Sequence, residues 1–268
     1  MRGVVDLEVA IQGGDRDLHS GVNGGLVPEP MFDLSAMISS LVDSSGLPAV
    51  AGLSDGSCSP EISDQDLGNL MAASQQMSVE KISKRLGLNA GLSKGLEALK
   101  RTWVQPSISI TEVGKGPRHQ HGRHIANRAS CVLSVRTPGQ RGEDVVNCLK
   151  RHLHHEFAKR RSCNQLEMNI LAVSEAWLTK PTSKVFCAAR AAVADAWKIE
   201  ESSVLAVREG GTIAILPLLE AELGCDVVQM AFSQASDAVH LPNERMSRAV
   251  LARAVDAIAG TLSRLAEG

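Results

Sequence analysis

The chain has 268 residues, of which 44% are hydrophobic and 22% charged, and its formal net charge is −2 at pH 7. This composition is typical of a globular protein with a sizeable core, and the length allows one large domain or two smaller ones. The balanced charge excludes the electrostatic footprint of a protein that binds nucleic acid or an anionic membrane, and no apolar run is long enough to cross a bilayer.

Six cysteines are dispersed along the chain, and none forms a Cys-x-x-Cys pair. We therefore expect reduced, buried thiols in a cytoplasmic protein. A strand pattern begins within three residues of Met1, and we therefore expect no signal or transit peptide.

Alternating apolar residues predict a strand at residues 5–11, where Val5, Leu7 and Val9 are separated by polar Asp6 and Glu8. After the Pro-Glu-Pro run at residues 28–30, apolar side chains recur at three- and four-residue spacing and predict a helix over residues 30–43. Residues 47–105 are expected to form an irregular, partly helical insertion.

Strand patterns return at residues 107–111, 130–136 and 166–170, with a helix predicted at 142–159 from apolar residues in steps of four. The order β-α-β-β-α-β is that of the split βαβ, or ferredoxin-like, arrangement. We predict one such α+β domain over residues 1–173.

Residues 174–268 alternate between predicted helices at 182–198, 212–223 and 244–265 and predicted strands at 204–207 and 226–232. That alternation indicates α/β layering. Two parallel strands cannot cover both faces of a sheet, so we expect this segment to be an incomplete half of an α/β domain.

Two glycine-rich motifs are candidates for function. His19 stands in Asp-Leu-His-Ser-Gly, followed by Gly24 and Gly25, in a loop after the first strand. Its alternative role is that of a turn residue, because glycine and serine dominate turns. The second motif, Arg-Glu-Gly-Gly-Thr at residues 208–212, lies between a predicted strand and a predicted helix. Paired glycines there allow a ligand close to the backbone and to free N–H groups, although a tight connection capped by Thr212 would use the same residues.

His240 lies in a loop before the last helix and is a candidate metal ligand, although a lone histidine is more often structural. Two further groups contain several histidines: His119, His121 and His124, and His152, His154, His155 and Glu156. Neither has a known zinc spacing, so we interpret them as solvated surface or loop, with metal binding by the 119–124 loop as a weaker alternative. The Glu200-Glu201 pair is interpreted as a cap.

Together these motifs resemble the carnosine dipeptidase and aminoacylase family of di-zinc metallopeptidases, from about Arg2 to Leu265. The Asp-Leu-His-Ser-Gly run is similar to the family's lid, and Arg-Glu-Gly-Gly-Thr to its carnosinase-like branch. The resemblance implies that residues 1–173 form the lid and dimerisation domain, with helix 30–43 at the subunit contact. Residues 174–268 would be the C-terminal part of the catalytic domain.

The resemblance also implies roles for single residues. His19 would reach into the active site of the partner subunit and polarise the scissile carbonyl. Arg136 would grip the substrate carboxylate, and Glu209, Gly210 and Thr212 would form the substrate-binding turn. The substrate would be a small peptide.

By the same resemblance, His240 would be the final ligand of a site with two zinc ions, or manganese in their place. In the family the other metal ligands and the general base precede the lid, and we expect this chain to lack them. The chain also has Ile125-Ala126-Asn127 where the family usually has Ile-Pro. Since hydrolysis of this kind needs a metal-activated water and a carboxylate, the chain alone is expected to be inactive and not to bind zinc stably.

Two functions stay open at this point. In the first, the chain is part of a metal-dependent peptidase that hydrolyses dipeptides or related N-acyl amino acids and forms a homodimer through the lid. In the second, it is a stand-alone dimerisation or regulatory partner, a pseudo-enzyme that pairs with a full-length paralogue.

Overall fold

The structure, a computed structural model, describes residues 1–53, 62–87, 95–115, 122–234 and 236–267. The chain packs as two compact units. The first comprises Met1–Glu61, Arg101–Trp177 and Glu209–Thr212, and the second comprises Ile62–Lys100, Leu178–Arg208 and Ile213–Gly268. The expected domain boundary at residue 173 stays a prediction. Residues 62–87 and 95–100, which lie within the expected insertion, pack with the second unit.

The first unit is built on a four-stranded antiparallel sheet in the order β3-β5-β1-β6. Its strands are β1 (Gly3–Gln12), β3 (Ser107–Lys115), β5 (Arg128–Thr137) and β6 (Gln165–Ser174). Every second residue of β5 is buried. The β1–β5 register runs from Gly3 opposite Thr137 to Gln12 opposite Arg128. This register places the apolar residues of both strands on one face of the sheet.

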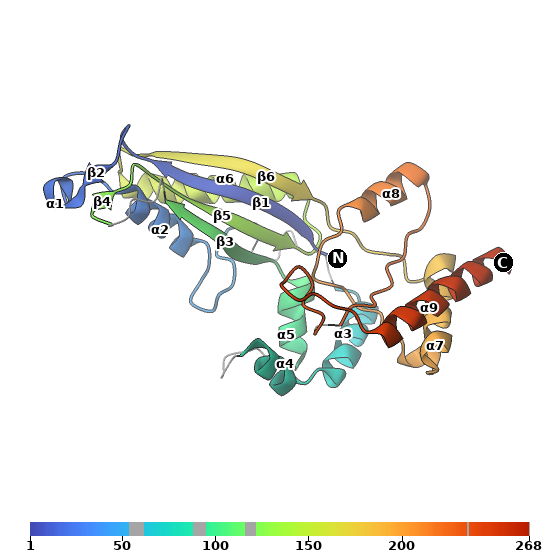
Figure 1. The fold of residues 1–268 in the computed structure, drawn as a ribbon. Helices are drawn as coiled ribbons and strands as arrows, with labels where there is room; N and C mark the ends of the chain where they lie inside the picture. Colours follow the sequence, from blue (N-terminus) through green and yellow to red (C-terminus); the bar gives the residue numbers. More distant parts are fainter. Residues whose placement is uncertain (54–61, 88–94, 116–121, 235, 268) are drawn as a thin grey trace. The chain divides into compact units, whose positions relative to one another are not determined.

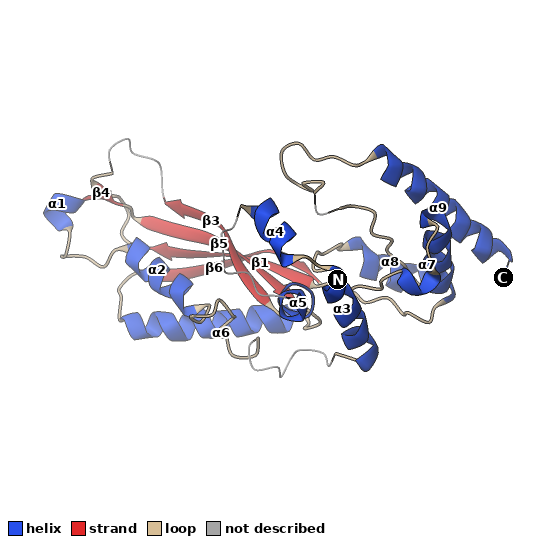
Figure 2. Cartoon of the chain, turned by 90° about the horizontal axis from the view of Figure 1, so that it is seen from below, coloured by secondary structure: helices blue, strands red, loops and turns tan. Residues whose placement is uncertain are grey.

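Two helices, α2 (Pro30–Ser40) and α6 (Gly142–Arg160), cover that face, as Figure 2 shows. The buried residues Val145, Leu149 and Leu153 of α6 follow one another in steps of four, as the sequence predicts. Pro30 begins α2, where its missing N–H leaves no helical hydrogen bond unmade. The resulting order, β1-α2-β3-β5-α6-β6, confirms the predicted ferredoxin-like arrangement.

A small ribbon extends from one end of the sheet. It consists of β2 (Leu18–His19), α1 (Ser20–Asn23) and β4 (His124–Ile125), with β2 antiparallel to β4. Figure 1 shows this ribbon beyond the end of β1 that lies opposite the N-terminus. The Gly13 N–H donates to the carbonyl of Asn127 at 2.7 Å, which joins the two chain segments where they leave the sheet.

The described part of the second unit is helical. Its elements are α3 (Asp64–Gln76), α4 (Val79–Leu86), α5 (Gly95–Leu99), α7 (Lys184–Trp197), η2 (Glu201–Ser203), α8 (Ile215–Leu223) and α9 (Arg248–Glu267). The π-helical turn η1 (Lys100–Val104) follows α5. Buried small residues, among them Ala189, Ala192, Ala254 and Ala257, allow α7 and α9 to pack closely.

The prediction of strands at residues 204–207 and 226–232 is wrong, because neither segment joins a sheet in the described chain. A strand is stabilised by hydrogen bonds to a neighbouring strand, and apolar periodicity alone does not supply that neighbour. The segment 226–232 has other anchors: the Thr179 hydroxyl donates to the Val227 carbonyl at 2.7 Å, and Phe232 stacks on Trp197 with ring centroids 5.9 Å apart. The mixed α/β class is nevertheless confirmed.

Of the six cysteines, Cys58 lies outside the described residues, and the other five are free thiols. Cys131 and Cys148 are buried as expected. The expectation of burial is wrong for three exposed cysteines: Cys163, Cys187 and Cys225. None of the described helices combines the length and the apolar character that a membrane span requires.

The core of the first unit makes a direct prediction for Leu133, which is 0% exposed at the centre of β5. Leu133→Ala removes buried methyl groups and leaves a cavity, so we expect it to lower the free energy of unfolding by about 2–5 kcal/mol. The matched control is Leu171→Ala, because Leu171 on edge strand β6 is 55% exposed. Urea denaturation of both variants measures the difference, and equal losses would contradict the assigned core.

Candidate functional site

Arg136 lies near the end of the inner strand β5, opposite Val4 of β1 and Ser107 of β3. Its Nη1 donates to the Thr212 Oγ1 at 2.6 Å, and the Thr212 hydroxyl donates to the backbone carbonyl of Arg2 at 2.7 Å. Thr212 comes from the Arg-Glu-Gly-Gly-Thr motif, whose residues 209–212 pack within the first unit. The structure thus brings Arg136 and Thr212 together, as the proposed substrate-binding turn requires.

Arg2 holds the same turn from a second side. Its Nε donates to the Gly210 carbonyl at 3.0 Å, and its Nη1 donates to the Gln105 carbonyl at 3.2 Å and to the Ser107 Oγ at 2.9 Å. Gly210 lies so close to the backbone that an added Cβ would be 2.3 Å from the Thr102 carbonyl oxygen. The turn can therefore pack here because residue 210 has no side chain.

We call Arg2, Arg136, Glu209, Gly210 and Thr212 the Arg136 cluster. Burial and the nearby charge of Arg136 lower the pKa of Arg2 to about 10, against the opposing effect of the Glu209 carboxylate. The Glu209 Oε1 accepts the Gly211 N–H at 3.0 Å, which curls the side chain over its own turn. Two cations and one carboxylate thus share a half-buried site, and the excess of positive charge favours an anionic ligand.

The sequence prediction did not include Arg2, Gln105 or Ser107. The strand pattern does contain a signal for Arg2. Arg2 is two residues before Val4, so both lie on the same face of the sheet, and Val4 is the residue that pairs with Arg136. The register between β1 and β5 is needed to use that signal.

His19 lies in β2 and is the N-cap of α1, where its Nδ1 accepts the Gly21 N–H at 3.1 Å. It is exposed, and its partner across the ribbon is His124. Asp17 braces this ribbon, since its Oδ1 accepts the Asn127 N–H at 2.9 Å and its Oδ2 lies 3.8 Å from the His124 Nε2. His19 therefore does act as a turn residue, and this hydrogen bond fixes its imidazole at the exposed end of the ribbon.

Within one chain, His19 and the Arg136 cluster are far apart. Arg136 pairs with Val4, whereas Arg128 pairs with Gln12 at the end of β1 that leads to the ribbon. These eight residue steps along β5 span roughly 26 Å at the usual rise per strand residue. The strand β2, which contains His19, lies beyond that end (Figure 1), so His19 cannot act with Arg136 of its own chain on one small substrate.

His240 belongs to the second unit and has a positive φ of 63°, an unusual backbone conformation for a non-glycine residue. Its N–H lies 3.3 Å from the Glu244 Oε2, and its side chain is exposed. The loop is anchored by buried Asp237, whose Oδ2 accepts the Gln234 N–H at 2.7 Å. Among the residues that the structure describes, no group of three or more His, Cys, Asp or Glu could hold a metal ion.

The other histidine groups have separate outcomes. His119 and His121 lie outside the described residues. His152 packs between α6 and α2, with its Nε2 3.0 Å from both the hydroxyl and the carbonyl oxygen of Ser40. Burial lowers the pKa of His152, which opposes the charged form. Glu156 forms an ion pair with Lys159 at 2.6 Å. Glu200 occupies the N-cap position of the short helix η2, but its side chain makes no capping hydrogen bond.

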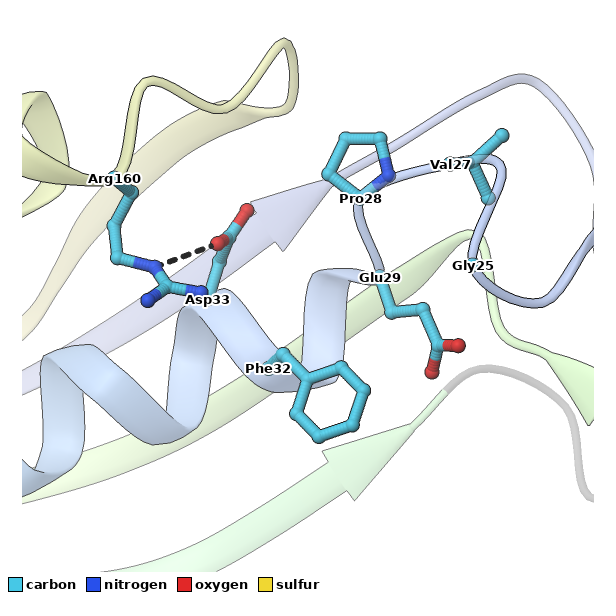
Figure 3. A pocket seen from close by; sticks show the side chains of 7 residues that line it. All are labelled: Gly25, Val27, Pro28, Glu29, Phe32, Asp33 and Arg160. Carbon is cyan, nitrogen blue, oxygen red and sulfur yellow. Dashed lines mark hydrogen bonds and ion pairs between the residues drawn. The ribbon is translucent and has the colours of Figure 1, made fainter.

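A pocket of about 380 Å³ lies at the start of α2 and was not predicted (Figure 3). Buried Asp33 accepts hydrogen bonds from the Arg160 Nε at 3.0 Å and from the Asn164 Nδ2 at 2.8 Å. Burial alone would raise the pKa of Asp33, but hydrogen bonds from Ser162, Asn164 and Arg160 hold it below its ordinary value of 3.8. Both oxygens of the Asp33 carboxylate already accept hydrogen bonds from these partners. Asp33 therefore has a structural role, in which it joins α2 to the end of α6.

Comparison with known proteins finds metallodipeptidases among the relatives of this chain. A Cys-Gly metallodipeptidase of Candida albicans is 30% identical over 250 residues, which are 92% of this chain and 50% of that protein. The human β-Ala-His dipeptidase is 28% identical over 237 residues, which are 87% of this chain and 45% of that protein. The chain therefore spans about half the length of the relatives it matches. No protein-family model matches it.

Among solved structures, the dipeptidase Dug1p from Saccharomyces cerevisiae superposes with a TM-score of 0.88 at 25% identity. The match covers 100% of this chain and 55% of that one. Human carnosine dipeptidase 1 superposes with a TM-score of 0.85 at 24% identity and supports the same fold. These similarities confirm the resemblance first seen in the motifs.

The close approach of Gly210 to Thr102 predicts different results at two neighbouring glycines. Gly210→Ala would force a Cβ to within 2.3 Å of a carbonyl oxygen, so we expect it to destabilise the first unit by about 1–3 kcal/mol. Gly211→Ala is the control, because its added Cβ would have no neighbour nearer than 3.5 Å. Urea denaturation compares them, and a tolerated Gly210→Ala would contradict the packing of the turn.

The Asp33 network predicts a pH-dependent loss of stability. The folded-state pKa of Asp33 is lower than its unfolded value, so its stabilisation is complete above about pH 4 and is lost as the pH falls through the folded-state pKa. Asp33→Asn should lower the free energy of unfolding by about 1–3 kcal/mol at pH 7. The gap to the unsubstituted chain should narrow on acidification below pH 4.

Asp15→Asn, at an exposed carboxylate, is the control for Asp33→Asn. Denaturation curves recorded from pH 7 to pH 2 give the comparison. A constant gap between Asp33→Asn and the unsubstituted chain over that range would contradict the role of the ionised carboxylate.

Proposed function

Because the chain belongs to the metallodipeptidase family, we propose that it forms the lid and substrate-binding part of a metal-dependent peptidase. The proposed substrates are dipeptides or related N-acyl amino acids, which carry a free carboxylate. The observation that carries this proposal is the Arg136 cluster, in which an arginine lies beside a glycine-rich turn on the open face of a sheet.

Arg136 is suited to bind that carboxylate. A guanidinium has five N–H donors in a planar fork, and a carboxylate can accept two of them side by side. Within the described residues, the Arg136 guanidinium donates one hydrogen bond, to Thr212. The remaining donors are therefore available to a ligand. Gly211, where an added Cβ would meet no atom nearer than 3.5 Å, leaves room for a small substrate beside the turn, and Glu209 would contact the polar groups of that substrate.

The metal site requires more ligands than the described residues bring together. Zinc in proteins takes about four ligands, and His240 alone does not meet that need. We propose that His240 is one ligand of a site for two zinc or manganese ions, completed by polypeptide other than this chain. When bound, the metal would acidify a water molecule and polarise the scissile carbonyl. By this proposal the chain alone is inactive.

An apolar stripe on α9 supports the need for a further polypeptide. The stripe consists of exposed residues spaced by four, three, four and three positions: Leu251, Val255, Ile258, Leu262 and Leu265. A neighbouring face of α9 packs on α7 through alanines. A continuous exposed apolar stripe is typical of a surface that another element covers. The half of the relatives' length that this chain does not span is the occupant that we propose.

The separation of His19 from Arg136 supports a homodimer through the lid. One chain cannot apply both residues to one substrate, whereas two chains could exchange them, with His19 of each protomer completing the site of the other. His19 would then stabilise the polarised carbonyl while Arg136 holds the carboxylate end. A cytoplasmic location agrees with the free cysteines and stays a prediction.

A second candidate function is that of a dimerisation or regulatory partner for a full-length paralogue. It is favoured by the continuous core of the first unit, which the sheet and its two helices form without the second unit. In that case the first unit would dimerise while its own Arg136 cluster stayed unused. Activity of the paralogue would then depend on His19 and not on Arg136 of this chain.

Substitution of Arg136 tests the proposed function in protein that carries this chain together with the metal-binding half. Arg136→Met should lower kcat/KM for the dipeptide Cys-Gly by about 100-fold, because loss of a charged hydrogen-bonded partner costs about 2–5 kcal/mol. Arg136→Lys keeps the charge without the fork, so its loss should be smaller. A steady-state peptidase assay measures both.

The matched control is the substrate with an amidated C-terminus, which has no carboxylate for Arg136 to bind. Arg136→Met should change its hydrolysis little. Equal losses for the free acid and the amide would contradict carboxylate binding by Arg136. Metal-dependent hydrolysis by the chain alone would contradict the need for a second half.

A further inference from the structure

The Thr212 hydroxyl connects the two arginines of the Arg136 cluster. A hydroxyl has one proton to donate, and Thr212 donates it to the backbone carbonyl of Arg2 at 2.7 Å. Thr212 can therefore only accept from Arg136, whose Nη1 lies 2.6 Å away. The carbonyl of Arg2 thus fixes the direction of the hydroxyl, and the hydroxyl fixes one edge of the Arg136 guanidinium.

The side chain of Arg2 fixes the position of the turn that carries Thr212. It bonds the Gly210 carbonyl from the turn and two groups at the start of β3, the Gln105 carbonyl and the Ser107 hydroxyl. Gly210 is also in close contact with Thr102. Arg2, which lies just before β1, therefore links the turn to the residues at the start of β3.

The two arginines differ in what they bond. Arg2 makes its three side-chain hydrogen bonds to neutral protein groups, and its pKa is lowered to about 10 by burial and by the charge of Arg136. Arg136 bonds one hydroxyl and retains other donors within the described residues. Arg2 therefore stabilises the turn, whereas Arg136 has donors for a ligand.

We propose that Arg2 is a positioning residue, which holds the 209–212 turn so that Thr212 aligns the Arg136 guanidinium with the carboxylate of the substrate. This inference rests on the proposed function, since it assumes that Arg136 binds that carboxylate. Arg2 acts through Gly210 and Thr212 and does not itself contact the substrate.

Nitrogen-15 NMR of the arginine side chains in the full chain tests this role without catalysis. The first readout is the Arg136 Nη signal of the chain without added dipeptide. The hydrogen bond to Thr212 should slow both the exchange of the Nη protons with water and the rotation of the Nη group. The second is the shift of the Arg136 Nε–H on titration with glycylglycine. Arg2→Met should remove the slowed signal and weaken glycylglycine binding by about tenfold or more, since a misplaced guanidinium loses about 1.4 kcal/mol or more.

Two further variants separate positioning from general damage. Thr212→Val removes the hydroxyl at nearly constant volume and should weaken binding by a similar factor. If Arg2 acts through Thr212, the double variant should be no weaker than either single variant. Arg2→Lys should restore part of the binding, and it replaces Arg2→Met if that chain does not fold. Arg141→Met is the control, because Arg141 is exposed and forms an ion pair with exposed Glu143.

The outcomes distinguish the inference from the proposed function. Unchanged glycylglycine binding by Arg2→Met, or losses that add in the double variant, would overturn the positioning role. If glycylglycine and its C-terminal amide both fail to shift Arg136 in the unsubstituted chain, the proposed carboxylate site fails. The slowed Arg136 signal then decides the role of Arg2. If the signal is lost in Arg2→Met and persists in Arg141→Met, the positioning role is supported. If the signal persists in both variants, the positioning role is overturned.

Discussion

The register between β1 and β5 is the constraint on which the rest of the first unit depends. A shift by one residue would turn every apolar side chain of a strand to the other face and remove it from the helices. The same register sets the functional geometry, because it places Arg136 opposite Val4 and sends the chain into the His19 ribbon at the other end. Core packing and the separation of the two candidate functional residues therefore have one cause.

Local patterns in the sequence were sufficient to predict the four strands of the main sheet and the two helices that cover it, but not the ribbon of β2, α1 and β4. Alternation with a period of two marked the strands of the sheet, and steps of four marked α6, because each element buries one face against the same core. The resemblance assigned substrate binding separately to Arg136 and to the Arg-Glu-Gly-Gly-Thr turn. No local pattern brings residues 2, 136 and 212 together, since that contact depends on the β1–β5 register and on the return of the chain at residues 209–212.

The errors of prediction also have a common physical origin. Residues 204–207 and 226–232 have strand-like composition, yet in the described chain they lack hydrogen-bonded neighbours, which composition does not encode. Cys163, Cys187 and Cys225 were expected to be buried but are exposed, because burial also depends on tertiary packing that the local sequence does not encode.

The Arg136 cluster places two like charges side by side, an arrangement that is unfavourable without compensation. The protein compensates at Arg2 with two backbone carbonyls, a hydroxyl and the nearby Glu209, so that the Arg2 charge is stabilised by groups that stay in place. The positive charge of Arg136 then lacks a matching anion among its hydrogen-bond partners, because Thr212 is neutral. A substrate carboxylate would supply that anion, and its binding would relieve the repulsion between the two arginines. The energetic cost of the unliganded cluster is therefore itself an argument for an anionic ligand at this turn.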